Sequence, residues 1–140
     1  MRTLLLALAL TTPAHAWQAT VGDICTLSHA TDDAEIFLTF DPTQPLYTLT
    51  VTLNTTTWAE APWFAMRFDG PSRIDISTGR HAINGATLSV ADRGFGNVLD
   101  GLEFNDTALA FTENQVAVFP LAGAAPEVRT FRECQANFLS

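Results

Sequence analysis

Hydrophobic and polar residues alternate along most of the chain, with the period of two that β-strands require. The stretch LYTLTVTL at 46–53 shows this best, because every second residue is apolar and the residues between are threonines. Residues 35–40 (EIFLTF) repeat the pattern, and the turn-forming DPTQP at 41–45 separates the two stretches. This alternation predicts half-buried antiparallel strands.

Shorter stretches with the same alternation continue to the last quarter of the chain. They are residues 24–29, 64–68, 74–76, 87–91, 107–112 and 115–121. Residues 79–85 between two of them are expected to form a loop, and Glu113-Asn114 is expected to be a hairpin turn. We therefore expect a mainly β protein: an antiparallel β-sandwich or partly closed barrel of about eight strands.

The C-terminal segment changes to the helical period. Within residues 125–138, the apolar side chains of Val128, Phe131, Cys134 and Phe138 recur at helical spacing. Pro126 precedes them and suits a first helical turn, where a missing amide hydrogen costs little. The pattern predicts a C-terminal helix with one apolar face.

A glycine-rich stretch, DRGFGNVLDGLEF at 92–104, is expected to contain a short helix near 97–103. Asn97 would cap its first turn and Asp100 would complete a capping box. An anion contact at the same helix end and an irregular loop are the alternatives. A dinucleotide loop is not expected, because Leu99 stands where the third glycine belongs, and the chain has no lysine for a P-loop.

The first sixteen residues have the features of an export signal. Arg2 is followed by an apolar run and by Ala-His-Ala, so cleavage is expected after Ala16. Residues 17–140 would then form a single β-rich domain in the periplasm or the medium. The apolar run is too short to span a bilayer, and no other segment approaches that length, so no membrane span is expected.

The charge and the cysteine content limit the possible functions further. The formal net charge is −8, and the basic residues are scattered arginines, so binding of nucleic acid is not expected. The two cysteines, Cys25 and Cys134, lie near opposite ends of the exported part and predict a disulfide bond. Two free thiols are the alternative.

Two groups of residues are candidates for chemistry. His29, Asp32, Asp33 and Glu35 include possible metal ligands, but they lack calcium-loop spacing and the thiolates or imidazoles that zinc prefers, so a solvated acidic turn is expected. His81 could act as a base with Ser77 or Asp92, yet no nucleophile motif accompanies it. We therefore expect no metal, no cofactor and no catalytic residues.

The candidate interaction surface is TTTWAEAPWF, residues 55–64. If this segment runs over one end of the sandwich, Trp58, Pro62 and Trp63 would be exposed to a protein partner. In the alternative, both tryptophans fold back over the end of the sheet.

The sequence resembles a group of short exported α-proteobacterial proteins. The matching stretches are CTLSH, DPTQPLYTLT, FAMRFDGP, DRGFGNVLDGLEFND and PLAGAAPEVRTFREC. Some of that group bear the name of an ABC excinuclease, which these residues contradict because a DNA-repair ATPase needs a P-loop and a basic surface. Residues 95–134 are also similar to the invasion-associated locus B family, with Leu121 and Gly123 in its L-x-G segment. That resemblance implies a β-hairpin leading to a C-terminal helix and no catalytic residues.

The sequence thus favours a non-enzymatic periplasmic interaction or envelope-associated protein stabilised by one disulfide. The alternatives are a small hydrolase that uses His81, or a carrier that binds an apolar ligand between the sheets. A carrier needs an apolar cavity of about several hundred Å³.

Overall fold

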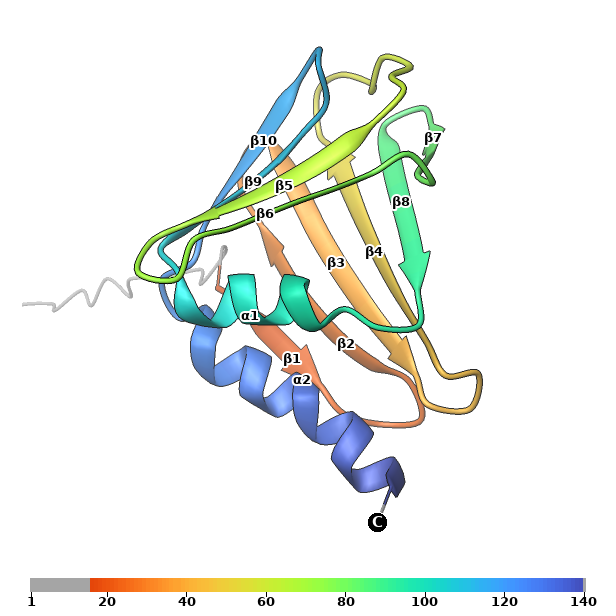
Figure 1. The fold of residues 1–140 in the computed structure, drawn as a ribbon, viewed down its shortest axis with the longest axis vertical. Coiled ribbons are helices and arrows are strands. Elements are labelled where there is room, and N and C mark those ends of the chain that lie inside the picture. The colour runs from red at the N-terminus through yellow and green to blue at the C-terminus, as the bar shows by residue number, and fades with distance from the viewer. Residues whose placement is uncertain (1–15, 140) are drawn as a thin grey trace, which may run out of the picture.

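The computed structural model describes the backbone of residues 16–139 and the side chains as far as Cys134. It contains two antiparallel sheets and two helices (Figure 1). The strands are β1 (Gln18–Thr20), β2 (Cys25–Ala30), β3 (Ala34–Asp41), β4 (Leu46–Leu53), β5 (Phe64–Asp69), β6 (Ile74–Thr78), β7 (Ala82–Asn84), β8 (Thr87–Asp92), β9 (Thr107–Phe111) and β10 (Val116–Pro120). The helices are α1 (Gly96–Phe104) and α2 (Ala124–Leu139).

The two sheets form an open sandwich. One has the strand order β1-β2-β3-β4-β8-β7 and the other the order β10-β9-β5-β6, so neither closes into a barrel. The sandwich, the predicted strands and the C-terminal helix are confirmed. Two strands, β1 and β7, were not expected, and the loop predicted at 79–85 contains β7. Each has only three residues, too few to show a periodic pattern.

Alternation decides which side of each strand enters the core. In β4 every second side chain is buried, from Tyr47 to Leu53, while the threonines between them lie on the outer side. Strand β3 alternates in the same way and pairs with β4 along its whole length, from Ala34 opposite Leu53 to Asp41 opposite Leu46. The hydrophobic pattern therefore sets both the facing and the register of these strands.

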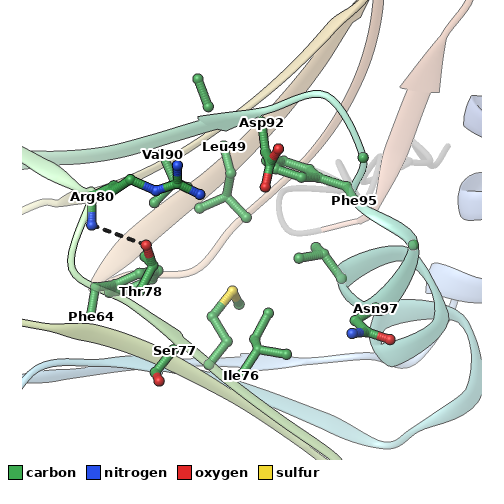
Figure 2. A pocket seen from close by; sticks show the side chains of 15 residues that line it. Leu49, Phe64, Ile76, Ser77, Thr78, Arg80, Val90, Asp92, Phe95 and Asn97 are labelled. Carbon is green, nitrogen blue, oxygen red and sulfur yellow. Dashed lines mark hydrogen bonds between the residues drawn. The ribbon is translucent and has the colours of Figure 1, made fainter.

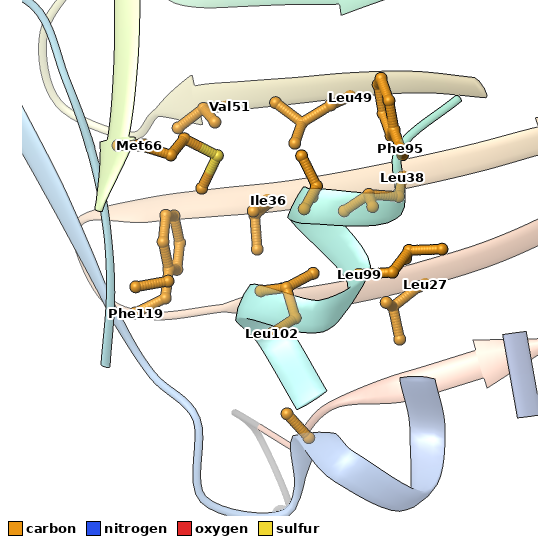
Figure 3. Packing of buried hydrophobic residues seen from close by; sticks show 14 of the residues in the cluster. Leu27, Ile36, Leu38, Leu49, Val51, Met66, Phe95, Leu99, Leu102 and Phe119 are labelled. Atoms are coloured by element: carbon orange, nitrogen blue, oxygen red, sulfur yellow. The ribbon is translucent and has the colours of Figure 1, made fainter. Parts of the chain in front are cut away.

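The core lies between the inner faces of the sheets and beneath α1 (Figure 3). Ile36, Leu38, Leu49 and Val51 from one sheet face Met66 and Phe119 from the other, and Leu99 and Leu102 of α1 fill the end between them. Burial of such side chains contributes about 1.5–3 kcal/mol each.

Helix α2 packs its apolar face against β1, β2 and α1. Val128, Phe131 and Cys134 are each at most 3% exposed, as the helical spacing predicts, whereas the Phe138 side chain lies outside the described part. Arg132 of α2 also donates hydrogen bonds to Asp100 (2.8 Å) and Glu103 (2.9 Å) of α1.

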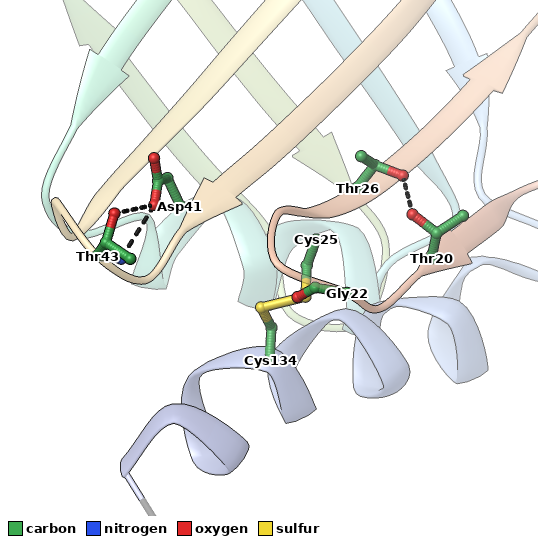
Figure 4. The surroundings of a disulfide bond; sticks show 7 residues. All are labelled: Thr20, Gly22, Cys25, Thr26, Asp41, Thr43 and Cys134. Carbon is green, nitrogen blue, oxygen red and sulfur yellow. Dashed lines mark hydrogen bonds between the residues drawn. A yellow bond between two sulfur atoms is a disulfide. The ribbon is translucent and has the colours of Figure 1, made fainter.

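The expected disulfide is present and joins the start of β2 to α2 (Figure 4). The Cα atoms of Cys25 and Cys134 are 6.1 Å apart, and 109 positions separate them in sequence. The bond therefore holds the C-terminal helix against the N-terminal sheet. Residues 1–15 of the expected export signal lie outside the described residues, and no helix within the described ones is long and apolar enough to cross a membrane.

Candidate binding cleft

A cleft of about 460 Å³ opens between the free edges of β6 and β8, where the two sheets separate (Figure 2). Strand β7 pairs only with the first half of β8, so the second half of β8 has no neighbour on that side. The connection from β6 to β7 borders one end of the cleft, and the first turn of α1 borders the other.

The floor of the cleft is apolar. Leu49, Phe64, Met66, Phe95 and Val98 line it and are each at most 7% exposed. Two further apolar side chains, of Ile76 on β6 and Val90 on β8, occupy inward positions but remain partly exposed. These two side chains would lie in a closed core if the sheet edges met, so the open cleft leaves apolar surface in contact with solvent.

The rim of the cleft is polar. Arg80 comes from the β6–β7 connection and Asp92 from the end of β8, and both side chains border the opening with Thr78 and Asn97 (Figure 2). Arg80 makes no side-chain hydrogen bond or ion pair with any described residue. The Asp92 carboxylate accepts a hydrogen bond of 2.6 Å from the backbone amide of Arg93.

The first turn of α1 also faces the cleft, and its capping differs from our prediction. The N-cap is Phe95, which has no capping side chain, so the assignment of Asn97 as N-cap was wrong. Asp100 completes no capping box and instead bonds to Arg132 of α2. The helix starts one residue earlier than expected because Leu99 donates to the carbonyl of Phe95. Its first amides have no side-chain acceptor and no acidic neighbour in the first turn.

His81 packs against Phe64, with ring centroids 6.4 Å apart, but does not form a catalytic pair. Its Nε2 lies 2.9 Å from the carbonyl oxygen of Ala61, and its Nδ1 is buried without a hydrogen-bond partner among the described residues. Neither Ser77 nor Asp92 bonds to it within the described part of the chain. The contact ties the β6–β7 connection to the segment before β5, which is a structural role.

The residues expected at an interaction surface do not lie together. Trp58 is only 4% exposed, and its Nε1 donates to the carbonyl of Val51 (3.0 Å), so it folds back over the sheet as in the alternative and is not exposed to a partner. Trp58 fits an inner position beside Phe64 because its indole nitrogen finds a buried acceptor there. Pro62 is exposed, and Trp63 is half-buried against Phe111 on the outer face.

The acidic turn is separated from the histidine that precedes it. His29 is buried and stacks on Trp17, with ring centroids 4.7 Å apart, whereas Asp32, Asp33 and Glu35 are exposed. Among the residues that the structure describes, no group of three metal-ligating side chains comes together.

Sequence reasoning missed the cleft and the core position of His29. The sequence did contain a signal for the buried position of His29, because His29 follows Cys25 and Leu27 in the series of inward side chains along β2. A weaker signal pointed to the cleft: Asp92 continues the inward series of Leu88 and Val90, so a carboxylate occupies a core-type position. A charge at such a position indicates an opening in the core.

No protein-family model matches the chain, and no curated protein matches it significantly. The fold is similar to that in the crystal structure of invasion associated protein B from Bartonella henselae, with a TM-score of 0.58 and 13% sequence identity. The likeness covers 91% of this chain and 99% of that one. It therefore extends well beyond residues 95–134, the range for which a resemblance was expected from the sequence. At this identity the comparison shows a shared fold and leaves the activity to be argued from the cleft.

Proposed function

We propose that this protein is an exported, non-enzymatic binding protein that holds a small amphipathic molecule in the cleft between β6 and β8. The observation that carries this proposal is the cleft itself. Its volume of about 460 Å³, its apolar floor and its few polar rim groups match the composition of small-molecule sites.

The rim favours a ligand with an acidic end. Arg80 offers a guanidinium without a partner among the described residues, and the first residues of α1, whose amides have no side-chain acceptor, border the same opening. The Asp92 carboxylate on the same rim would repel an anion, so the acidic end of the ligand would lie on the Arg80 side of the opening. An apolar body would cover Ile76 and Val90 while the acidic group meets Arg80.

Two further observations support the non-enzymatic and exported parts of the proposal. His81 bonds to a backbone carbonyl and, among the described residues, to no nucleophile, which favours a binding role over the hydrolase alternative. The buried disulfide is the kind that persists in oxidising compartments, in agreement with the signal-like segment at residues 1–16.

The test uses three probes with one ten-carbon chain: decanoate, decanol and decylamine. We expect isothermal titration calorimetry to show saturable binding, with decanoate the tightest. Val90→Trp should abolish binding by filling the cleft, whereas Ser89→Trp, on the opposite face of the same strand, should preserve it. Arg80→Gln should weaken the binding of decanoate but leave the binding of decanol unchanged. Absence of binding by all three probes, or equal binding by the Val90→Trp variant, would refute the proposal.

A further inference from the structure

The four edge strands of the two sheets differ in how they are protected. Strands β1 and β7 have three residues each, and β6 carries Asp75 in ion pairs with Arg67 (2.8 Å) and Arg73 (3.2 Å). Strand β10 has five residues and no charge, and its Val116 and Val118 are 54% and 49% exposed. Natural sheet edges are usually short, charged or covered. Among the described strands, β10 is the unprotected edge.

The hydrogen-bond pattern shows which backbone groups of β10 are free. Thr112 donates to Gln115 (3.0 Å) next to the register pair Phe111–Val116. Bonded and non-bonded pairs alternate along an antiparallel ladder, so Ala117 bonds to β9. The N–H and C=O groups of Val116 and its second neighbour Val118 therefore point away from the sheet.

The far end of this edge is already occupied. The Pro120 carbonyl also points away from β9, and it accepts a hydrogen bond of 2.9 Å from Nε1 of Trp17. Pro120 has no N–H to offer a further strand. The free part of the edge is therefore the run from Val116 to Val118.

The outward side chains next to this run form one apolar surface, which we call the β10 face: Trp63, Leu109, Phe111, Val116 and Val118. Val116 lies opposite Phe111 and Val118 opposite Leu109 in the register. Trp63 packs edge-on against Phe111, with ring centroids 5.9 Å apart. A shallow groove runs along part of this face, beside Arg67.

Acidic residues flank both ends of β10. Glu113 is exposed in the turn before it, where Asn114 also contacts the backbone of Glu60. Asp106 is exposed at the other end, where its carbonyl accepts the amide of Leu121. An antiparallel second copy would bring the Glu113 end of one chain beside the Asp106 end of the other. With a formal charge of −8 on each chain, that pairing is repulsive, whereas a basic segment would be attracted.

We propose that the β10 edge binds an extended segment of a partner protein that has apolar residues at alternate positions and lysine or arginine at both ends. The segment adds a fifth strand to the four-stranded sheet through the backbone of Val116 and Val118, and its apolar side chains pack on the β10 face. This interaction is separate from the ligand proposed for the cleft.

The test uses a fluorescent synthetic peptide with a Val-Thr-Val-Thr-Val centre and two lysines at each end. We expect saturable binding by fluorescence anisotropy, weakening as salt is added. The same peptide with glutamates at its ends should not bind. In the complex, hydrogen exchange at the Val116 and Val118 amides should slow, because those amides become bonded.

Matched variants locate the interaction. Val118→Lys should weaken binding about tenfold or more by placing a charge against the basic peptide. Thr50→Lys, with the same charge on the outer face of the other sheet, should have little effect. The Val90→Trp variant, whose cleft is filled, should bind the peptide as the unmodified protein does. That result would show that the peptide does not bind in the cleft. Equal binding of both peptides, or no peptide binding, would overturn the proposal, as would Val118-dependent dimerisation in sedimentation velocity without peptide binding.

Discussion

Gly101 allows α1 to approach the second sheet because it has no side chain. A Cβ atom at this position would overlap the ring of Phe68, which is fully buried on β5. The residue lies inside α1 and not at either of its ends. Its role is close packing, which depends on a partner distant in sequence.

Gly101→Ala should therefore destabilise the protein by about 1–3 kcal/mol through overpacking. The matched control is Gly96→Ala in the same helix, where a Cβ meets nothing within 4 Å. That control should be neutral or stabilising, because alanine favours helix more than glycine does. Urea unfolding measures the stability of both variants. Equal stability of the two would contradict the close packing of Gly101 against Phe68.

Tyr47 is the single tyrosine of the chain and is 6% exposed. Burial raises the pKa of Tyr47 above its ordinary value of 10.0, although the nearby charge of Arg132 opposes the shift. We expect near-ultraviolet absorbance to show phenolate forming only above that value in the folded protein. The unfolded chain ionises first, so stability should be complete below about pH 10 and fall as the pH rises through the raised pKa. Tyr47→Phe should remove both the phenolate signal and this loss of stability. A phenolate titration with its midpoint at the ordinary tyrosine value would be inconsistent with burial of Tyr47.

At the residue scale, the sequence showed which side chains point into the core, but it did not show which other residues those side chains contact. Alternation could place His29 inside, yet nothing local showed that it stacks on Trp17. Trp58 lay outside any periodic stretch, so its buried hydrogen bond to Val51 depended on how the loop folds back. Capping by Asn97 failed because the helix starts at Gly96, which places the N-cap at Phe95, two residues before Asn97.

At the scale of secondary structure, a disulfide and ion pairs reinforce the packing of α2 on the rest of the fold. The disulfide fixes it to β2, and Arg132 bridges it to Asp100 and Glu103 of α1. The eight longer strands and both helices could be predicted because hydrophobic periodicity is local, whereas the three-residue β1 and β7 could not. The pairing of strands far apart in the chain, such as β4 with β8 in the six-stranded sheet, could not be predicted from a local pattern.

Cys134→Ser should lower the stability by about 4–5 kcal/mol, because the disulfide closes a loop of more than a hundred residues. The disulfide holds the end of α2, so hydrogen exchange should rise there before it rises in β3 and β4. A double variant, Cys25→Ser with Cys134→Ser, should behave like the single one. Unchanged thermal unfolding of the single variant would mean that packing alone holds α2.

At the scale of the whole molecule, the cleft exists because the sheets separate between β6 and β8. Ile76 and Val90 obey the same alternation as fully buried residues, so the sequence could not show that they line an opening. Only the strand order places these two edges opposite each other. The proposed ligand site is therefore a property of the assembled sandwich.

The most direct test of the ligand site uses Met66, a floor residue of the cleft. The chain has two methionines, and Met1 lies in the expected export signal, so the processed protein labelled with [methyl-¹³C]methionine should give one signal. We expect decanoate to shift that signal along a saturating curve, with the affinity found by calorimetry and no shift in Val90→Trp. A Met66 signal that stays unchanged at saturating decanoate would contradict binding in the cleft.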